Sequence, residues 1–268
     1  MRPTLLVLWL VVALLAAGIT AATMWPRHGK RDDVTAYIRQ VNGVSRSFSG
    51  RYKAVDKAFR TFSFAPAQSA RQLPRVRAAA RELTRLRRRI EAVPAPPAAA
   101  TLRRRLIAFF RQQEAVGWEL VAVSGYVPRL AAVERPLAPA STRMRAALKK
   151  GSTAKSQAAA LRSYADVVDG AAETLSAIHA PPLFATSQSR QVSRLRGSAA
   201  AVRRLAAAIA GNDRKAVQKA IDELARTPTA SSAAAATAVA AYNRRVDRIR
   251  VLARSVELER RRLGEKLG

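Results

Sequence analysis

The sequence of 268 residues predicts an all-α protein, in which an N-terminal transmembrane helix precedes an antiparallel bundle of long amphipathic helices with proline corners. Apolar residues recur at alternating spacings of three and four along most of the chain, which is the period of one face of an α-helix. Val, Ile and aromatic residues nowhere alternate with polar residues between tight glycine turns, as strands would require. With 49% hydrophobic and 25% charged residues, the chain is expected to fold around a core.

The uncharged N-terminal segment is the first expected element. Leu5 to Trp25 contains no charged residue over 21 positions, about 30 Å as a helix, which matches the hydrocarbon core of a bilayer. The alternative is a signal peptide cleaved near Gly18 or Ala22, where small residues permit processing. Because the apolar run continues past both sites, we expect residues 1–31 to remain as a membrane anchor. The span is marked by Leu5, Trp9, Leu15 and Trp25.

The charges that flank the span do not decide on which side of the membrane the body lies. Arg2 precedes the span, and Arg27, Lys30 and Arg31 follow it, so positive-inside counting would leave the body in the cytoplasm. Long domains, however, translocate largely regardless of flanking charge. We therefore expect a single-pass protein of the cell membrane with an extracytoplasmic body.

Residues 32–268 are expected to form the bundle, in two similar halves of about 32–135 and 140–268. Asp32 or Asp33 suits the first N-cap. The next expected helix begins near Pro74, and a third ends before Pro128, because proline inside a helix removes a backbone donor and clashes with the preceding turn. Three apolar stripes mark the first half: Val34, Ile38, Val41, Phe48, Tyr52, Val55, Phe59 and Phe62; Val76, Ala79, Leu83, Leu86, Ile90 and Val93; and Leu102, Leu106, Phe109, Gln113, Val116, Leu120, Val123 and Val127.

The second half repeats the helical period. A short helix over Arg214–Ala225 is expected after Gly211, with Asn212 or Asp213 as its N-cap. The longer stripes are Leu161, Tyr164, Val168, Ala171, Leu175 and Ile178; Val192, Leu195, Ala199, Val202 and Ile209; and Tyr242, Val246, Ile249, Ala253, Val256 and Leu263.

A double proline follows an amphipathic helix in each half. Ile90–Pro97 and Leu175–Pro182 both end in Pro-Pro, 85 residues apart, and both precede another helix. Proline lacks the N–H that would be unpaired at a helix start, so the pattern favours a stiff corner between two packed helices. A ligand for a proline-recognition domain is the alternative, but the flanks are too apolar and the segment is too short.

These corners, together with Tyr242-Asn243 and the Arg244-Arg245 pair that follows, resemble a loose set of uncharacterised, membrane-anchored or lipidated helical-bundle proteins of actinobacterial type. The resemblance extends over most of the chain at the level of pattern and composition. It implies an extracytoplasmic helical bundle and no known activity. The chain lacks the lipidated cysteine of many such proteins, so the apolar span would have to supply the anchor.

No motif for catalysis is found, so we expect a non-enzymatic protein without cofactor or metal. The absence of cysteine excludes disulfides, thiol catalysis and cysteine-based zinc sites. His28 and His179 have no carboxylate partner at helical spacing, and the Glu-x-x-His pairs of a dimetal bundle are absent. The sequence also lacks G-x-S-x-G, a P-loop and G-x-G-x-x-G.

A polar position within the third stripe is the best candidate for a small-molecule pocket. Gln113 and Trp118, close to Glu114, could contact a bound small molecule. The alternative is structural, since a single buried polar residue often fixes helix register and a large aromatic covers the edge of a seam.

Excess positive charge is the strongest surface signal. Lys and Arg number 48 against 18 Asp and Glu, giving a net charge of +30, and 39 of the cations are Arg. Dense Arg attracts polyanions by counterion release and forked hydrogen bonds to phosphate, although a solvated face would look the same in an Arg-rich proteome. Two triplets flank the first corner and are expected near one end of the bundle: Arg87, Arg88 and Arg89, and Arg103, Arg104 and Arg105.

These observations favour a membrane-tethered scaffold or sensor of the cell envelope that contacts anionic lipid or wall polymer. Sequence-specific nucleic-acid binding is not expected, because neither a recognised module nor an aromatic-lined groove is present. The alternatives are a small-molecule sensor bundle, with its cavity near Gln113, and a non-specific nucleic-acid binder if the body is cytoplasmic. Nothing in the sequence indicates a protein partner.

Overall fold

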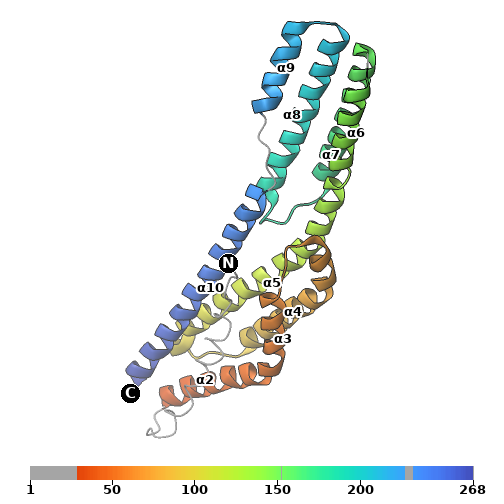
Figure 1. Ribbon diagram of the computed structural model, residues 1–268. Coiled ribbons are helices and arrows are strands. Elements are labelled where there is room, and N and C mark those ends of the chain that lie inside the picture. The colour runs from red at the N-terminus through yellow and green to blue at the C-terminus, as the bar shows by residue number, and fades with distance from the viewer. Residues whose placement is uncertain (1–28, 152, 227–231, 268) are drawn as a thin grey trace. The chain divides into compact units, whose positions relative to one another are not determined.

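The computed structural model describes residues 29–151, 153–226 and 232–267, and every regular element within these ranges is helical (Figure 1). The all-α class predicted from the apolar period is therefore confirmed. The predicted span, with Leu5, Trp9, Leu15 and Trp25, lies outside the described residues. Among the helices of the described ranges, none combines the length and the apolar composition that crossing a bilayer requires.

The chain divides into two compact units. In the described residues, unit 1 comprises the chain up to Ser124 and again from Ala240, and unit 2 comprises Gly125 to Val239. The division falls inside two long helices, α5 (Ala100–Glu134) and α10 (Ser232–Leu267). The units differ from the expected halves of about 32–135 and 140–268, because most of α10 belongs to unit 1. The similarity of the two halves stays a prediction.

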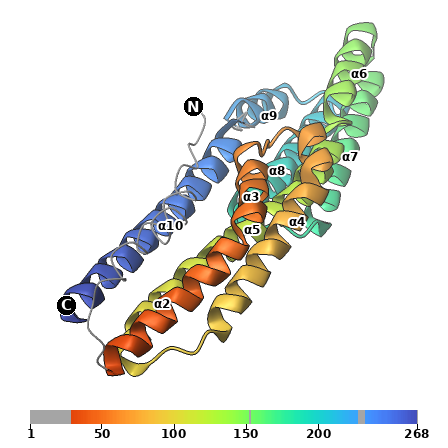
Figure 2. The same cartoon turned by 90° about the horizontal axis from the view of Figure 1, so that it is seen from below.

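Unit 1 contains the first helices of the chain. These are α2 (Gly29–Ser47), α3 (Ser49–Arg60), α4 (Pro66–Ala92) and the short 3₁₀ element η1 (Pro97–Ala99), with parts of α5 and α10. α3 packs along α4, and α2 lies beside α4 and η1 (Figure 2). The core includes many predicted stripe positions, together with residues outside the stripes such as Tyr37 and Phe110. The buried stripe positions include Val41, Phe48, Tyr52, Leu83, Leu86, Leu106, Phe109, Leu120, Tyr242, Ile249 and Val256.

Two prolines lie inside helices, although the sequence predicts that one helix begins near Pro74 and that another ends before Pro128. α4 continues through Pro74 and α5 continues through Pro128, so both expected boundaries are wrong. Pro128 offers no N–H to the carbonyl of Ser124, but the buried Ser69 hydroxyl donates to that carbonyl over 3.5 Å. A long, weak hydrogen bond from α4 thus compensates in part for the one that proline removes from α5.

Gly117 lies where α5 approaches its neighbours closely. A Cβ atom at this position would be 3.3 Å from both Leu83 Cδ1 and Phe59 Cζ, and 3.5 Å from the Cα atom of Ala80. The absence of a side chain therefore permits α3 and α4 to pack tightly against α5.

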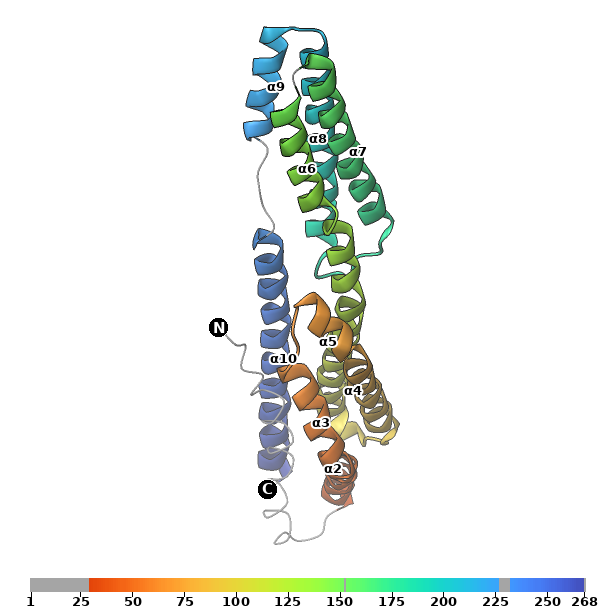
Figure 3. The ribbon, with the colours of Figure 1, turned by 45° about the vertical axis from the view of Figure 1, so that its right-hand side comes forward.

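Unit 2 contains α6 (Leu137–Lys150), α7 (Ala154–Ala177), α8 (Ala185–Ala210) and α9 (Arg214–Arg226). α7 and α8 are in extensive contact, and Figure 3 shows the α6–α7 and α8–α9 connections at the same end of this unit. Small side chains allow this close packing, since Ala158, Ala165 and Ala206 are buried in one core cluster of the unit.

Both proline corners are confirmed. α4 ends at Ala92 and α5 follows η1, while α7 ends at Ala177 and α8 begins at Ala185, after Pro181 and Pro182. At the second corner the buried Gln188 amide donates to the carbonyl oxygens of Leu175 and Ile178, at 2.6 and 2.7 Å. These bonds satisfy two acceptors at the C-terminal end of α7.

The turn between α8 and α9 uses both polar residues that the sequence offers as caps. Asn212 has φ 51°, a left-handed conformation that asparagine tolerates better than most residues. Asp213 is the N-cap, because its carboxylate accepts the backbone N–H of Ala216 at 3.0 Å.

Candidate functional site

The six arginines predicted to contact an anionic surface lie on either side of the first corner. One triplet is near the end of α4 and the other near the start of α5. Arg103 Nη2 donates to the carbonyl oxygen of Glu91 over 2.9 Å, which brings the two triplets to the same end of the helix pair, as expected.

Three of the six arginines make structural contacts. Arg87 pairs with two carboxylates, and its side chain is only 18% exposed. Arg103 makes the carbonyl contact described above. Arg105 donates to the carbonyl oxygen of Ser255 at 2.8 Å and lies 3.3 Å from the carboxylate of Glu259, so it joins α5 to α10. These contacts give the three side chains a role in packing.

The other three arginines are exposed. Arg88 and Arg89 make no hydrogen bond or ion pair with the part of the chain that the structure describes, and Arg104 contacts the hydroxyl of Thr101 at 3.0 Å. These three side chains are free to meet a partner. Whether any of the six contacts an anionic surface stays a prediction.

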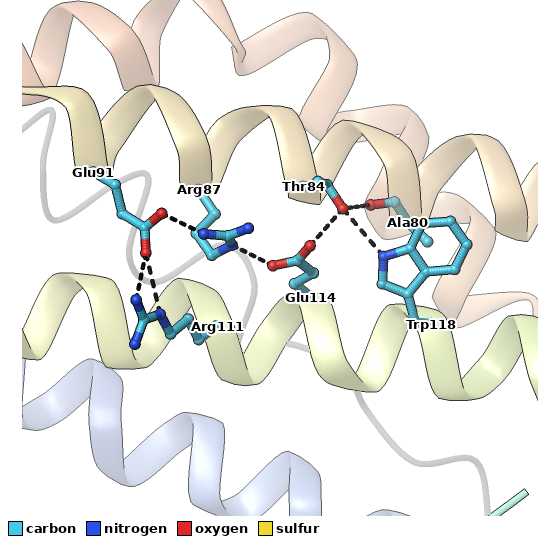
Figure 4. A network of polar contacts seen from close by, with 7 residues as sticks. All are labelled: Ala80, Thr84, Arg87, Glu91, Arg111, Glu114 and Trp118. Atoms are coloured by element: carbon cyan, nitrogen blue, oxygen red, sulfur yellow. Dashed lines mark hydrogen bonds and ion pairs between the residues drawn. The ribbon is translucent and has the colours of Figure 1, made fainter.

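A polar network joins α4 to α5 around Arg87 (Figure 4). Arg87 pairs with Glu91 on its own helix and with Glu114 on α5. The Oε1 atom of Glu91 also accepts from Arg111 Nε at 3.1 Å, and Thr84 Oγ1 donates to Glu114 Oε1 at 2.6 Å. Alternating charges on facing helices fix the register of α4 against α5.

The network shifts the ionisation of its members. Burial raises the pKa of Glu114, but hydrogen bonds from Thr84 and Arg87, with the charges of Arg87 and Arg88, outweigh burial, so the net pKa lies below the ordinary 4.5. The hydrogen bond to Glu114 is the largest cause of the raised pKa of Arg87. Both shifts favour the charged pair.

The lowered pKa of Glu114 makes stability depend on pH. The unfolded state binds the proton first, so this contribution is complete above about pH 4.5 and is lost as the pH falls through the lower folded value. We expect Glu114→Gln to lower the free energy of unfolding by about 1–3 kcal/mol at pH 7 and to flatten its loss between about pH 5 and 3. Urea unfolding across this range measures both effects.

Thr84→Val provides an intermediate variant, because it keeps the Glu114 carboxylate and removes the Thr84 hydroxyl that donates to it. Its loss of stability on acidification should be intermediate between those of the native chain and Glu114→Gln. Identical pH profiles for all three proteins would contradict the role assigned to Glu114.

The two residues of the predicted pocket lie on different sides of α5. Gln113 is 2% exposed and faces α3, where its Nε2 atom donates to the Tyr52 hydroxyl over 3.3 Å. Trp118 is 41% exposed and faces α4, where its indole N–H donates to Thr84 at 3.1 Å. The structure does not bring these side chains together. Contact of either one with a small molecule stays a prediction.

The exposed side of α4 carries a larger basic surface, which is not among the sites predicted from the sequence. Six of its arginines are exposed and make no hydrogen bond or ion pair with any described residue; we call them the α4 arginine face. Arg85 lies among them but pairs with Glu82. The sequence does contain a pattern that indicates such a surface: arginines recur every four residues in the row Arg77, Arg81, Arg85 and Arg89. The α4 arginine face comprises Arg71, Arg75, Arg77, Arg81, Arg88 and Arg89.

Elsewhere in the described chain, no group of three His, Asp or Glu side chains is arranged to hold a metal ion. A shallow hollow beside α9 is lined by residues of both charges, Lys215, Gln218, Lys219, Asp222 and Glu223.

The comparisons with known proteins assign no family or function to the chain. No protein-family model matches the chain, and searches of curated proteins and of solved structures give no significant match.

Proposed function

We propose that this chain is a non-enzymatic, membrane-tethered helical bundle of the cell envelope that holds a linear anionic wall polymer against the α4 arginine face. The observation that carries the proposal is the exposure of six unpaired arginines along one helix. From Arg71 to Arg89 they extend over about 27 Å at 1.5 Å per residue, so an extended polymer can follow this side of the helix.

Folding does not account for this face. Like charges at i,i+4 destabilise a helix, and Arg77, Arg81 and Arg89 share such a row with Arg85. Unit 1 carries 29 Lys and Arg against 11 Asp and Glu over residues 29–124 and 240–267, so the surroundings do not neutralise the row. An anionic polymer would relieve the repulsion and release its own counterions.

The rest of the proposal follows from the sequence. The uncharged segment from Leu5 to Trp25 supplies the tether, and the body is extracytoplasmic, where wall polymer is accessible. Arginine suits phosphate because its planar guanidinium donates two parallel hydrogen bonds. The bundle scaffolds or senses polymer near the membrane.

The test measures polymer binding by the full-length protein in neutral phosphatidylcholine nanodiscs. The probe is labelled linear poly(glycerol phosphate), titrated by fluorescence anisotropy between about 50 and 300 mM salt. Replacing the six residues of the α4 arginine face with Gln should weaken binding at least about tenfold at 150 mM salt. The slope of log affinity against log salt should flatten as well, since fewer phosphates are neutralised.

The matched control removes six exposed arginines from unit 2. It carries the same net charge, so a larger loss for the α4 variant supports a face rather than a general charge effect. Equal losses in the two variants would contradict the proposal, and preference for one DNA sequence would replace it with nucleic-acid recognition. The control substitutions to Gln are at Arg129, Arg135, Arg143, Arg162, Arg190 and Arg196.

A further inference from the structure

Five lysines gather at one end of unit 2, in a chain whose cations are mostly arginine. The chain has nine lysines, and five are in two short segments, 149–155 and 215–219. All five side chains are exposed. We call this set the lysine tip; it comprises Lys149, Lys150, Lys155, Lys215 and Lys219.

Packing inside unit 2 brings the two segments together. Leu148 of α6, Ala158 of α7 and Ile209 of α8 belong to one core cluster, so the end of α6, the start of α7 and the end of α8 are neighbours. α9 begins directly after α8 and packs against it. Figures 1 and 3 show both helix connections at this end of the unit. Cations 60 residues apart in sequence thus share one end of the unit.

Helix stability explains Lys149 and Lys150, which are in the last turn of α6, but not the lysines that open α7 and α9. Lys155 is in the first turn of α7, and Arg214 and Lys215 open α9, where the positive end of the helix dipole disfavours cations. Neither first turn contains an acidic residue. Asp213 is close by, but its carboxylate caps α9. The tip therefore concentrates positive charge from its side chains, because the positive ends of α7 and α9 lie beside the negative ends of α6 and α8.

The chemistry of the tip fits an anionic bilayer. Lysine is a compact, strongly hydrated charge on a flexible stem, which suits mobile headgroups, whereas arginine favours fixed bidentate contacts. The five lysines come from three helices that meet at this end, so they suit a broad surface, whereas a linear chain suits a row along one helix. We propose that the lysine tip is a docking surface for an anionic phospholipid bilayer. This role is separate from polymer binding on α4.

The test measures co-flotation of the full-length protein, held in neutral phosphatidylcholine nanodiscs, with phosphatidylglycerol-containing vesicles at 150 mM salt. Pure phosphatidylcholine vesicles serve as the neutral comparison and should not bind. Each lysine near an anionic surface strengthens binding about fivefold, so replacing all five with Gln should weaken it at least about 100-fold. The melting temperature should not fall greatly, because Lys155 and Lys215 occupy unfavourable helix positions.

A matched variant removes five exposed arginines from the sides of unit 2, Arg129, Arg135, Arg162, Arg190 and Arg196. It should keep vesicle binding within about threefold of the native value, and the variant of the α4 arginine face should still dock on vesicles.

The proposal is overturned if the native protein does not bind anionic vesicles, or if the tip and side variants lose vesicle binding equally. A tip variant that loses polymer binding but keeps vesicle binding would assign the tip to the polymer instead. Failure of the α4 variant to lose polymer binding bears on the proposed function alone.

Discussion

Replacing Leu86 or Leu120 with alanine should lower the free energy of unfolding by about 2–5 kcal/mol. Leu86 is 3% exposed on α4 and Leu120 is 1% exposed on α5, so each truncation leaves a cavity in the core of unit 1. The loss combines reduced apolar burial with contacts that the surrounding helices cannot restore. Chemical denaturation, followed by far-ultraviolet circular dichroism, measures the change.

Arg88→Ala is the control on the same helix. Arg88 is exposed two positions after Leu86, and its replacement should change stability by less than about 0.5 kcal/mol. Similar losses for Leu86→Ala and Arg88→Ala would mean that the buried face of α4 is assigned incorrectly.

Gly117→Leu should lower the free energy of unfolding by about 1–3 kcal/mol or more. The Cβ atom alone would reach 3.3 Å from Leu83 and Phe59, and the remaining leucine atoms have no space between α3, α4 and α5. The helices must therefore separate or their side chains must leave favoured rotamers. Thermal unfolding monitored by circular dichroism detects the loss.

Gly43→Ala tests whether the effect arises from packing. Gly43 is exposed in α2, and a methyl group there would meet no atom of another element within 4 Å, so alanine should stabilise the protein by about 0.5–1 kcal/mol through helix propensity. If Gly117→Leu also stabilised the protein, the close approach at Gly117 would not exist.

The sequence predicts the helical class and much of the core, because burial of one helix face repeats with the helix period. Val41, Phe109 and Val256 are stripe positions, and each is buried. Helix boundaries are harder to predict where a tertiary contact compensates for proline. The hydroxyl that serves the carbonyl freed by Pro128 comes from Ser69, 55 residues before Ser124, and local sequence carries no sign of it.

The candidate surface is only partly predictable for a geometric reason. Consecutive residues of a helix point about 100° apart, so the three side chains of Arg87, Arg88 and Arg89 cover about 200°, and Arg87 turns inward while the other two stay exposed. Which member turns inward depends on where Glu114 lies on α5, 27 residues away. The α4 arginine face could have been found from its four-residue spacing, whereas the lysine tip depends on the fold of unit 2.

If the α4 arginine face binds polymer as proposed, the arginine row on α4 also couples folding to binding. Each like-charged pair one turn apart destabilises the free helix by a few tenths of a kcal/mol, and the pairing of Arg85 with Glu82 offsets only part of this. Dissolved salt screens that repulsion and weakens polymer binding at the same time, so the free protein and its complex respond to ionic strength in opposite directions. A bound polyanion then acts as a folding ligand: at a hundred times its Kd it would stabilise the native state by about 2.7 kcal/mol.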